Sequence, residues 1–315
     1  MFCRYALAKR QRVCICRQTL RKGVKMKVCK FIEDYYYKRA VKGLRKSTII
    51  GYKSSIDLYI LPTFGKMDFE DITVEMLEDW IDGIEKEGAA FKAYKTFRQI
   101  IRKAIDYDVF KGKDPTTKHI KVARKPRREP KILDGREVGE LLEGFRGHYL
   151  EATIICAVTL GLRRGEAFGL TWEDIDLRSG KVKIKRSYQK IAGEVLVLPP
   201  KTEKSKRICW LPKSALVRMR DLGRGKTGRI SIVDQPDQMA KDYKEHCKKN
   251  NLPYTSFTNL RHTWATLALE GGADIATIAN MLGHTDIMNA YNHYIVPRDK
   301  MYKKTQKMVD NLINW

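Results

Sequence analysis

The sequence predicts a mainly α-helical protein with a small antiparallel β-sheet, arranged as two folded units joined by a basic linker. Three observations carry this prediction. Apolar residues recur at helical spacing over most of the chain, strand-like alternation is confined to the region around residues 181–211, and prolines mixed with cations interrupt both patterns over residues 113–131. A chain of 315 residues is long enough for two or three compact units.

The charge balance indicates a polyanionic partner. The chain carries 62 Lys and Arg against 37 Asp and Glu, a net charge of +25, and such an excess is typical of proteins that bind nucleic acid. The longest apolar stretch falls short of the roughly 20 residues of a membrane span, and residues 1–30 lack the apolar core of a secretory signal. Seven cysteines without paired spacing indicate reduced thiols and no metal site. We therefore expect a cytoplasmic protein with no membrane contact.

The first unit is predicted as a helical bundle over residues 27–112, preceded by a basic arm of residues 1–26. Helical runs begin near Val28 and Ser47, the second of them ends at Pro62, and a third helix takes Thr73 as its N-cap. A fourth helix, around residues 91–105, has one apolar and one basic face. The cations of the basic face, which we expect to contact phosphates, are Lys92, Lys95, Arg98 and Arg102.

The linker of residues 113–131 is predicted to be extended, because proline disfavours helix and like charges repel one another. It could be a passive spacer, but the density of its cations favours a strap that follows a phosphate backbone. The cations that we assign to this strap are Lys121, Arg124, Lys125, Arg127 and Arg128.

A larger mixed unit is predicted over residues 132–298, followed by a tail helix over residues 299–315. Helices are expected near residues 134–145, 149–160, 166–170, 239–249, 258–270 and 275–282. Strands are expected near residues 182–184, 195–198 and 208–211, and the polar residues 199–206 would form the tip of a hairpin between the last two strands.

Three motifs in this unit supply the residue types that phosphoryl transfer needs. They are Gly-Leu-Arg-Arg-Gly-Glu ending at Glu166, Asn-Leu-Arg-His-Thr starting at Asn259, and Leu-Gly-His ending at His284, with Tyr-Asn-His following at Tyr291. Guanidinium groups offer phosphate paired planar donors and can stabilise the charge that metal ions stabilise elsewhere. Because tyrosine can be a covalent nucleophile, we expect phosphoryl transfer without a metal or nucleotide cofactor.

Over about residues 27–298, these motifs and their order resemble the tyrosine recombinases, the phage-type integrase family. The resemblance implies a SAM-like core-binding domain followed by a tyrosine-recombinase catalytic domain. It implies a site-specific recombinase that cleaves and rejoins DNA through a 3′-phosphotyrosyl intermediate, for integration or excision of a mobile element in a bacterial nucleoid. The implied partners are a double-stranded DNA recognition site, further copies assembling on it as dimers to tetramers by tail exchange, and accessory DNA-bending or directionality proteins.

The resemblance also implies the roles of individual residues. Arg163 and Arg261 would hold the scissile phosphate, with Arg164 as the alternative to Arg163. Lys201 would be the general acid for the 5′ oxygen, although Lys204 and Lys206 share its polar segment. The supporting positions are Glu166 beside the first arginine, His284 beside the phosphate, and His262 as a hydrogen-bonding neighbour of Arg261.

Two features depart from the family pattern. Thr258 stands where the family usually has a histidine, so one hydroxyl donor replaces a titratable group. Tyr291 lies seven residues after His284 and Tyr294 lies ten after it, and the family spacing falls between the two. The distance from His284 favours Tyr294 as the nucleophile, whereas the Tyr-x-His context favours Tyr291. We expect Tyr291, because motif context outranks loop length. These departures leave open an alternative, a degenerate, catalytically impaired integrase that only binds DNA.

Overall fold

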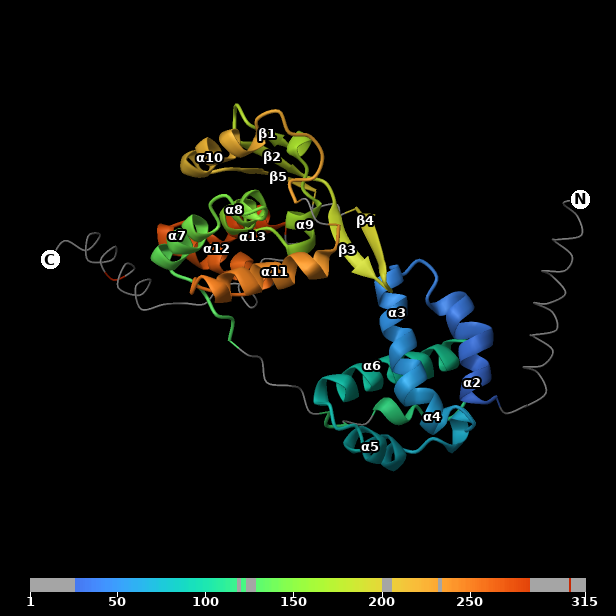
Figure 1. Cartoon of the computed structure of the whole chain (residues 1–315). Helices are drawn as coiled ribbons and strands as arrows, with labels where there is room; N and C mark the ends of the chain where they lie inside the picture. The colour runs from blue at the N-terminus through green and yellow to red at the C-terminus, as the bar shows by residue number, and fades with distance from the viewer. Residues whose placement is uncertain are drawn as a thin grey trace, which may run out of the picture. The chain divides into compact units, whose positions relative to one another are not determined.

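The computed structural model describes residues 26–117, 120–122, 129–199, 206–231, 234–283 and 306. Its contacts divide the chain into two compact units (Figure 1), residues 1–127 and 128–315. Each unit has an apolar core of its own. Within the described ranges, no helix is both long and apolar enough to cross a membrane. The predicted basic arm and tail helix fall outside these ranges except for Met26 and Gln306, and the predicted domain boundaries stay predictions.

Helices build the first unit. The helical elements are α2 (Val28–Phe31), η1 (Ile32–Ala40), α3 (Lys46–Ser55), η2 (Ile56–Ile60), α4 (Leu61–Phe64), η3 (Phe69–Asp71), α5 (Val74–Asp82), α6 (Glu87–Asp106) and η4 (Pro115–Thr117).

The long helix α6 supplies the centre of this bundle. Its apolar face is buried, and the ring of Phe97 stacks on that of Phe64 with their centres 4.6 Å apart. Helix α5 begins at the predicted cap, since the Thr73 hydroxyl accepts the N–H of Met76 at 3.2 Å. The indole of Trp80 donates to the carbonyl of Tyr59 at 3.0 Å and so ties α5 to η2. The fourth predicted helix is therefore confirmed, with its basic face outward.

The prediction that Pro62 ends the second helix is wrong. Helical backbone runs through it to Phe64, because the chain forms a π-helical turn over η2 directly before Pro62. Proline has no N–H to continue the α-helical ladder, and its ring crowds the preceding turn. A wider π turn relieves both conflicts.

The second unit combines helices with two small antiparallel sheets. Its elements are α7 (Gly135–Gly144), α8 (Glu151–Leu160), α9 (Arg164–Gly169), η5 (Trp172–Asp174), β1 (Ile175–Asp176), β2 (Lys181–Ile184), β3 (Ser187–Ile191), β4 (Glu194–Leu198), β5 (Arg207–Trp210), α10 (Lys213–Gly223), α11 (Pro236–Lys249), α12 (Phe257–Gly271) and α13 (Ile275–Leu282).

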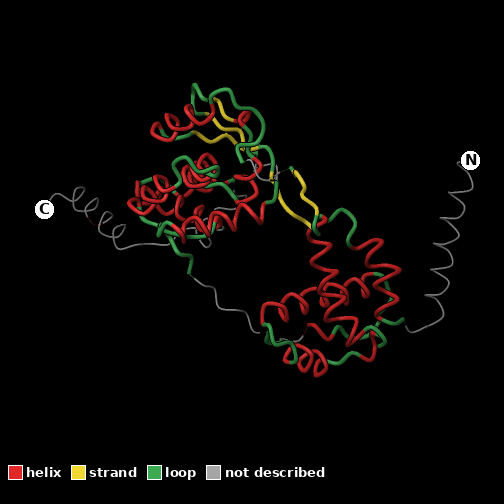
Figure 2. Tube along the Cα trace, viewed as in Figure 1, coloured by secondary structure: helices red, strands yellow, loops and turns green. Residues whose placement is uncertain are grey.

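The strands pair differently from the prediction (Figure 2). Strand β4 pairs with β3 across a tight turn at Ala192 and Gly193, both with positive φ, whereas β5 pairs with β2 in the sheet β1-β2-β5. The strands β4 and β5, which flank residues 199–206, therefore lie in different sheets and do not form the predicted hairpin. The sequence pattern missed β3, whose two-residue connection to β4 is the geometry that favours hairpin pairing.

Three helices form the frame on which the arginine motifs lie. Helix α8 is buried on nearly all its faces, and α12 packs against both α8 and α13 (Figure 1). The hydroxyl of Thr263 on α12 accepts the backbone N–H of Leu133 at 3.2 Å, which fixes the start of the second unit against this helix. The motifs, far apart in the chain, are thereby brought to one end of the frame.

His148 is expected to make the stability of the second unit pH-dependent. Its Nδ1 atom accepts the N–H of Leu150 at 3.1 Å, and its ring centre lies 4.3 Å from that of His246. Burial, and then the charge of His246, lower the pKa of His148, against a smaller opposing effect of Asp242. The unfolded chain then binds a proton here more readily, so the free energy of unfolding should fall as the pH drops below about 6.5.

Urea unfolding of the wild type and His148→Asn at about pH 7.5 and about pH 5.5 tests this prediction. Asparagine keeps an acceptor for Leu150 but does not titrate, so the variant should lose less stability on acidification than the wild type. An equal loss in both proteins would contradict the assignment to His148.

Candidate active site

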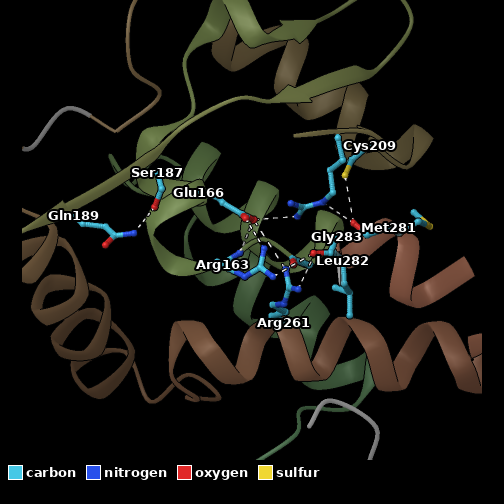
Figure 3. A network of polar contacts seen from close by, with 11 residues as sticks. Arg163, Glu166, Ser187, Gln189, Cys209, Arg261, Met281, Leu282 and Gly283 are labelled. Carbon is cyan, nitrogen blue, oxygen red and sulfur yellow. Dashed lines mark hydrogen bonds and ion pairs between the residues drawn. The ribbon is translucent and has the colours of Figure 1, made fainter. Parts of the chain in front are cut away.

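A buried carboxylate lies at the centre of the cluster that the arginine motifs form (Figure 3). Glu166 on α9 is 3% exposed, and its Oε1 atom accepts a hydrogen bond from Arg163 Nη1 at 2.8 Å. Its Oε2 atom accepts the backbone N–H of Arg163 and a hydrogen bond from Arg207 Nη2, each at 3.0 Å. The same oxygen lies 4.0 Å from Arg261 Nη1. Three guanidinium groups thus face one carboxylate, which leaves an excess of positive charge.

The first motif folds so that Arg163 and Glu166 meet. Helix α8 ends at Gly161 in the left-handed conformation, with φ +60°, and a Cβ atom there would come within 2.8 Å of Trp264 and 2.9 Å of Leu282. Arg163 is then the N-cap residue of α9, and the Glu166 side chain reaches back to its N–H as in a capping box. The turn requires glycine, and the cap orients the carboxylate.

Gly165 allows α9 to lie against β3. A Cβ atom at this position would come within 2.4 Å of the hydroxyl of Ser187 and 3.1 Å of the carbonyl of Tyr188. A larger residue would crowd β3, so the glycine inside the Arg-Arg-Gly-Glu motif lets α9 pack closely on this strand.

The two arginines predicted to hold a phosphate have different surroundings. The Arg261 side chain on α12 is 2% exposed and donates to the carbonyls of Gly161 at 2.9 Å and Leu282 at 2.8 Å. The Arg163 side chain is 35% exposed, and its Nη2 atom lies 3.5 Å from the carbonyl of Gly283. Arg261 is therefore held by the fold, whereas Arg163 presents its guanidinium to solvent.

Glu166 is ionised in this cluster. Burial alone would raise the pKa of its carboxyl, but the charge and hydrogen bond of Arg207, and then the charges of Arg163 and Arg261, lower it below its usual value. A carboxylate that stays charged cannot act as a general acid near neutral pH. Its role here is to orient guanidinium groups.

Arg207, at the start of β5, belongs to the cluster but is missing from the residues predicted from the sequence. Its side chain is 6% exposed. Along β5 the buried side chains are those of Arg207 and Cys209, while Ile208 and Trp210 are 41% and 57% exposed. Hydrophobicity alone would place Ile208 and Trp210 on the buried face. The clue in the sequence is the alternation of Arg207, Cys209 and Leu211, which a pattern based on hydrophobicity alone overlooks.

The remaining predicted residues of the arginine motifs lie on the helices α9 and α12. Thr258 is exposed near the start of α12, one helical turn before Arg261, and His262 is half-buried on the same helix. Arg164 is 50% exposed and its nearest carboxylate is Asp237, at 3.9 Å. The structure therefore brings Arg163, and not Arg164, to Glu166.

Other predicted site residues lie outside the described ranges, and their roles stay predictions. They are Lys201, His284, Tyr291 and Tyr294 in the second unit, and Arg124, Lys125, Arg127 and Arg128 in the linker.

Cations of α6 form a separate basic surface on the first unit. Lys95, Arg98 and Arg102 line one open hollow together with Lys103, and the Arg98 Nε atom is buried there without a hydrogen-bond partner. Lys92 lines a different hollow. Lys121 of the linker is exposed. Three of the four cations predicted on this helix thus share one surface.

The fold matches solved structures of DNA integrases. The Tn1549 transposon integrase in complex with a circular intermediate DNA superposes with a TM-score of 0.73 at 15% identity, over 90% of this chain and 99% of that one. The lambda integrase of a tetramer bound to a Holliday junction superposes with a TM-score of 0.59 at 18% identity, over 86% and 78%.

Sequence comparison defines the family. The phage integrase family matches residues 131–301, more than half of the chain, and the N-terminal SAM-like domain of phage integrases matches residues 30–84. A XerC-like tyrosine recombinase of Caldanaerobacter subterraneus subsp. tengcongensis is 25% identical over 265 residues, which cover 71% of this chain and 68% of that protein. The chain belongs to the phage integrase family, and the predicted fold class and resemblance are confirmed.

Proposed function

We propose that this protein is a site-specific DNA recombinase that cleaves and rejoins DNA strands through a 3′-phosphotyrosyl intermediate, and so integrates or excises a mobile element. The observation that carries the proposal is the cluster of Arg163, Arg207 and Arg261 around Glu166 in a chain of the phage integrase family. We propose that it acts in the bacterial cytoplasm, at the nucleoid, because its proposed substrate is DNA.

The proposed reaction begins when the phenolic oxygen of Tyr291 attacks the scissile phosphorus. Arg163 and Arg261 stabilise the charge on the non-bridging oxygens, which is the main demand of phosphoryl transfer. Lys201 gives a proton to the departing 5′ oxygen, and His284 lies beside the phosphate. The phosphotyrosyl bond keeps the energy of the broken phosphodiester, so that attack by a 5′ hydroxyl can reseal a strand without a nucleotide cofactor.

Glu166 supports this reaction through Arg163. Its carboxylate accepts a hydrogen bond from one terminal nitrogen of the Arg163 side chain at 2.8 Å and another from the Arg163 backbone N–H at 3.0 Å. The guanidinium is therefore oriented before a phosphate binds. Because Thr258 can donate a single hydrogen bond in place of the usual histidine, we expect a lower rate than a histidine would give, and not an inactive protein.

The proposed partners are a duplex recognition site and further copies of this chain. The similar integrases are seen with a circular intermediate DNA and, as a tetramer, with a Holliday junction. We propose dimers to tetramers on DNA, with the segment of residues 299–315 exchanged between neighbours. Accessory DNA-bending or directionality proteins complete the proposed set of partners.

Covalent capture from a pool of nicked duplexes tests this function for any target sequence. The nick lies beside a randomised core, so the short strand released by cleavage dissociates and religation is prevented. We expect sequences that remain attached to the denatured protein, in EDTA and without ATP, to converge on one site. A protein that enriches sequences under native conditions but leaves none attached after denaturation would be the DNA-binding alternative.

The basic surface of α6 is expected to contribute to DNA affinity. Replacing both Arg98 and Arg102 by alanine should weaken binding and reduce the slope of log affinity against log salt by about 1.8, because each phosphate contact contributes about 0.9. Lys103→Ala is the matched control, since this lysine lines the same hollow but is already paired with Asp106 at 2.7 Å. Fluorescence anisotropy across a salt series measures the slopes. Equal slopes in the double variant and the wild type would contradict the assignment.

A further inference from the structure

The C-terminal end of α13 is bonded by three different arginines. Arg207 Nε donates to the carbonyl of Met281 at 2.6 Å, Arg261 Nη2 to that of Leu282 at 2.8 Å, and Arg163 Nη2 to that of Gly283 at 3.5 Å. The last carbonyls of a helix lack partners within it, so cationic donors stabilise them. The same guanidinium groups face Glu166, and therefore join this carboxylate to the helix end immediately before His284.

Arg207 is buried, unlike Arg163, and it differs from Arg261, which is also buried, in bonding the Glu166 carboxylate directly, at 3.0 Å and not at 4.0 Å. Its side chain is 6% exposed, against 35% for Arg163, and its donors are directed inward, to Glu166 at 3.0 Å and to Met281 at 2.6 Å. Both of these donors are already bonded within the protein. Arg207 therefore acts on the reaction through the groups it holds.

Charge compensation is one of the effects of Arg207. It is the guanidinium nearest to Glu166 Oε2, at 3.0 Å, whereas Arg261 Nη1 stands 4.0 Å from the same oxygen while it donates to Gly161. Without Arg207, the buried carboxylate would attract Arg261 away from that carbonyl. Glu166 would then neutralise the positive charge of Arg261, which could no longer stabilise a phosphate.

Chain connectivity adds a second effect. Arg207 opens β5, six residues after Lys201 in the sequence, and β5 packs against α13. The thiol of Cys209, the next inward side chain of the strand, lies 3.9 Å from the same carbonyl of Met281. Arg207 thus links the segment that carries Lys201 to the helix end that leads to His284.

We propose that Arg207 is a positioning residue of the recombination reaction. Arg207 neutralises the charge of Glu166, so that Arg163 and Arg261 remain available to bind the phosphate, and it fixes the end of α13. The inference rests on the proposed function. In Arg207→Met the rate of covalent adduct formation at saturating DNA should fall about 10²-fold, as expected when reacting groups are displaced by about 1 Å. The dissociation constant for DNA and its salt dependence should stay unchanged, because Arg207 is not among the residues that we propose to hold phosphates.

A rescue experiment separates positioning from a merely structural role. In the double variant Arg207→Met with Glu166→Gln, the carboxylate charge that Arg207 compensates is absent. We expect this protein to form the adduct faster than Arg207→Met alone, and to fold even if the single variant does not, because the buried pair is replaced by neutral groups. Arg207→Lys, which keeps the charge but cannot bridge both partners, should fall between the wild type and Arg207→Met.

Arg218→Met is the matched control. Arg218 also bonds a buried carboxylate, Glu151, and a backbone carbonyl, that of Leu142 at 2.7 Å, but outside the cluster. Its loss should lower thermal stability and leave the adduct rate unchanged. Two results would overturn the positioning role alone. One is a double variant Arg207→Met with Glu166→Gln whose loss in adduct rate is the sum of the losses of the two single variants. The other is an Arg207→Met protein that forms the adduct as fast as Arg218→Met. A wild type that forms no adduct would overturn the proposed function, and the positioning role with it.

Discussion

Alanine in place of Arg163 is expected to slow DNA cleavage by about 10³-fold, the upper range for losing one preorganised donor to a transition state. Arg163 is the more exposed of the two predicted phosphate ligands, at 35%. The fold should survive, because Glu166 keeps both the backbone N–H of residue 163 and its ion pair with Arg207. Single-turnover cleavage at saturating DNA measures the effect without interference from binding.

Arg164→Ala is the matched control for that experiment. Arg164 is the adjacent residue, is 50% exposed, and approaches a carboxylate, that of Asp237, no closer than 3.9 Å. Its loss should change the cleavage rate by less than about tenfold, as for a surface charge. Arg163→Lys should fall between the two, because an ammonium keeps the charge but lacks the paired planar donors. A larger loss in Arg164→Ala than in Arg163→Ala would reverse the assignment.

Phenylalanine in place of Tyr291 is expected to reduce cleavage on the order of 10⁶-fold, as when an enzyme loses its covalent nucleophile. The substitution removes one hydroxyl and keeps the ring, so packing and DNA binding should be retained. Tyr294→Phe is the paired variant and should retain cleavage. The two variants are compared on the captured nicked duplex, with binding measured in parallel.

The result distinguishes the two spacings after His284. If Tyr294→Phe loses cleavage and Tyr291→Phe keeps it, the spacing argument is right and the Tyr-x-His context is misleading. If both single variants cleave like the wild type, neither phenol is the nucleophile and the proposed mechanism is wrong.

The helices could be predicted from the sequence because their signals are local. Thr73 caps α5, Gly161 and Gly283 end α8 and α13, and the apolar periodicity of α6 matches its buried face. The motifs also identified Arg163, Glu166 and Arg261, which the fold brings together. Composition gives the net charge of +25, which predicts a polyanionic partner independently of the fold.

Features that depend on distant parts of the chain could not be predicted in this way. The pairing of β5 with β2, and not with β4, joins segments more than 20 residues apart and leaves no local trace. The burial of Arg207 follows from that pairing, because it decides which face of β5 turns toward Glu166 and α13. Helical backbone through Pro62 likewise required the π turn before it, which propensity does not indicate.

Identifying the bond that joins the wild-type protein to DNA tests most directly the central claim, that Tyr291 forms a 3′-phosphotyrosyl intermediate. The captured adduct is digested with trypsin, and mass spectrometry with fragmentation examines the peptide of residues 262–298, which contains both candidate tyrosines. The released strand is labelled with polynucleotide kinase without phosphatase treatment. We predict a 3′ phosphate of DNA on Tyr291 and a released strand with a 5′ hydroxyl. A linkage through a 5′ phosphate, or cleavage that leaves no DNA on the protein, would contradict the account.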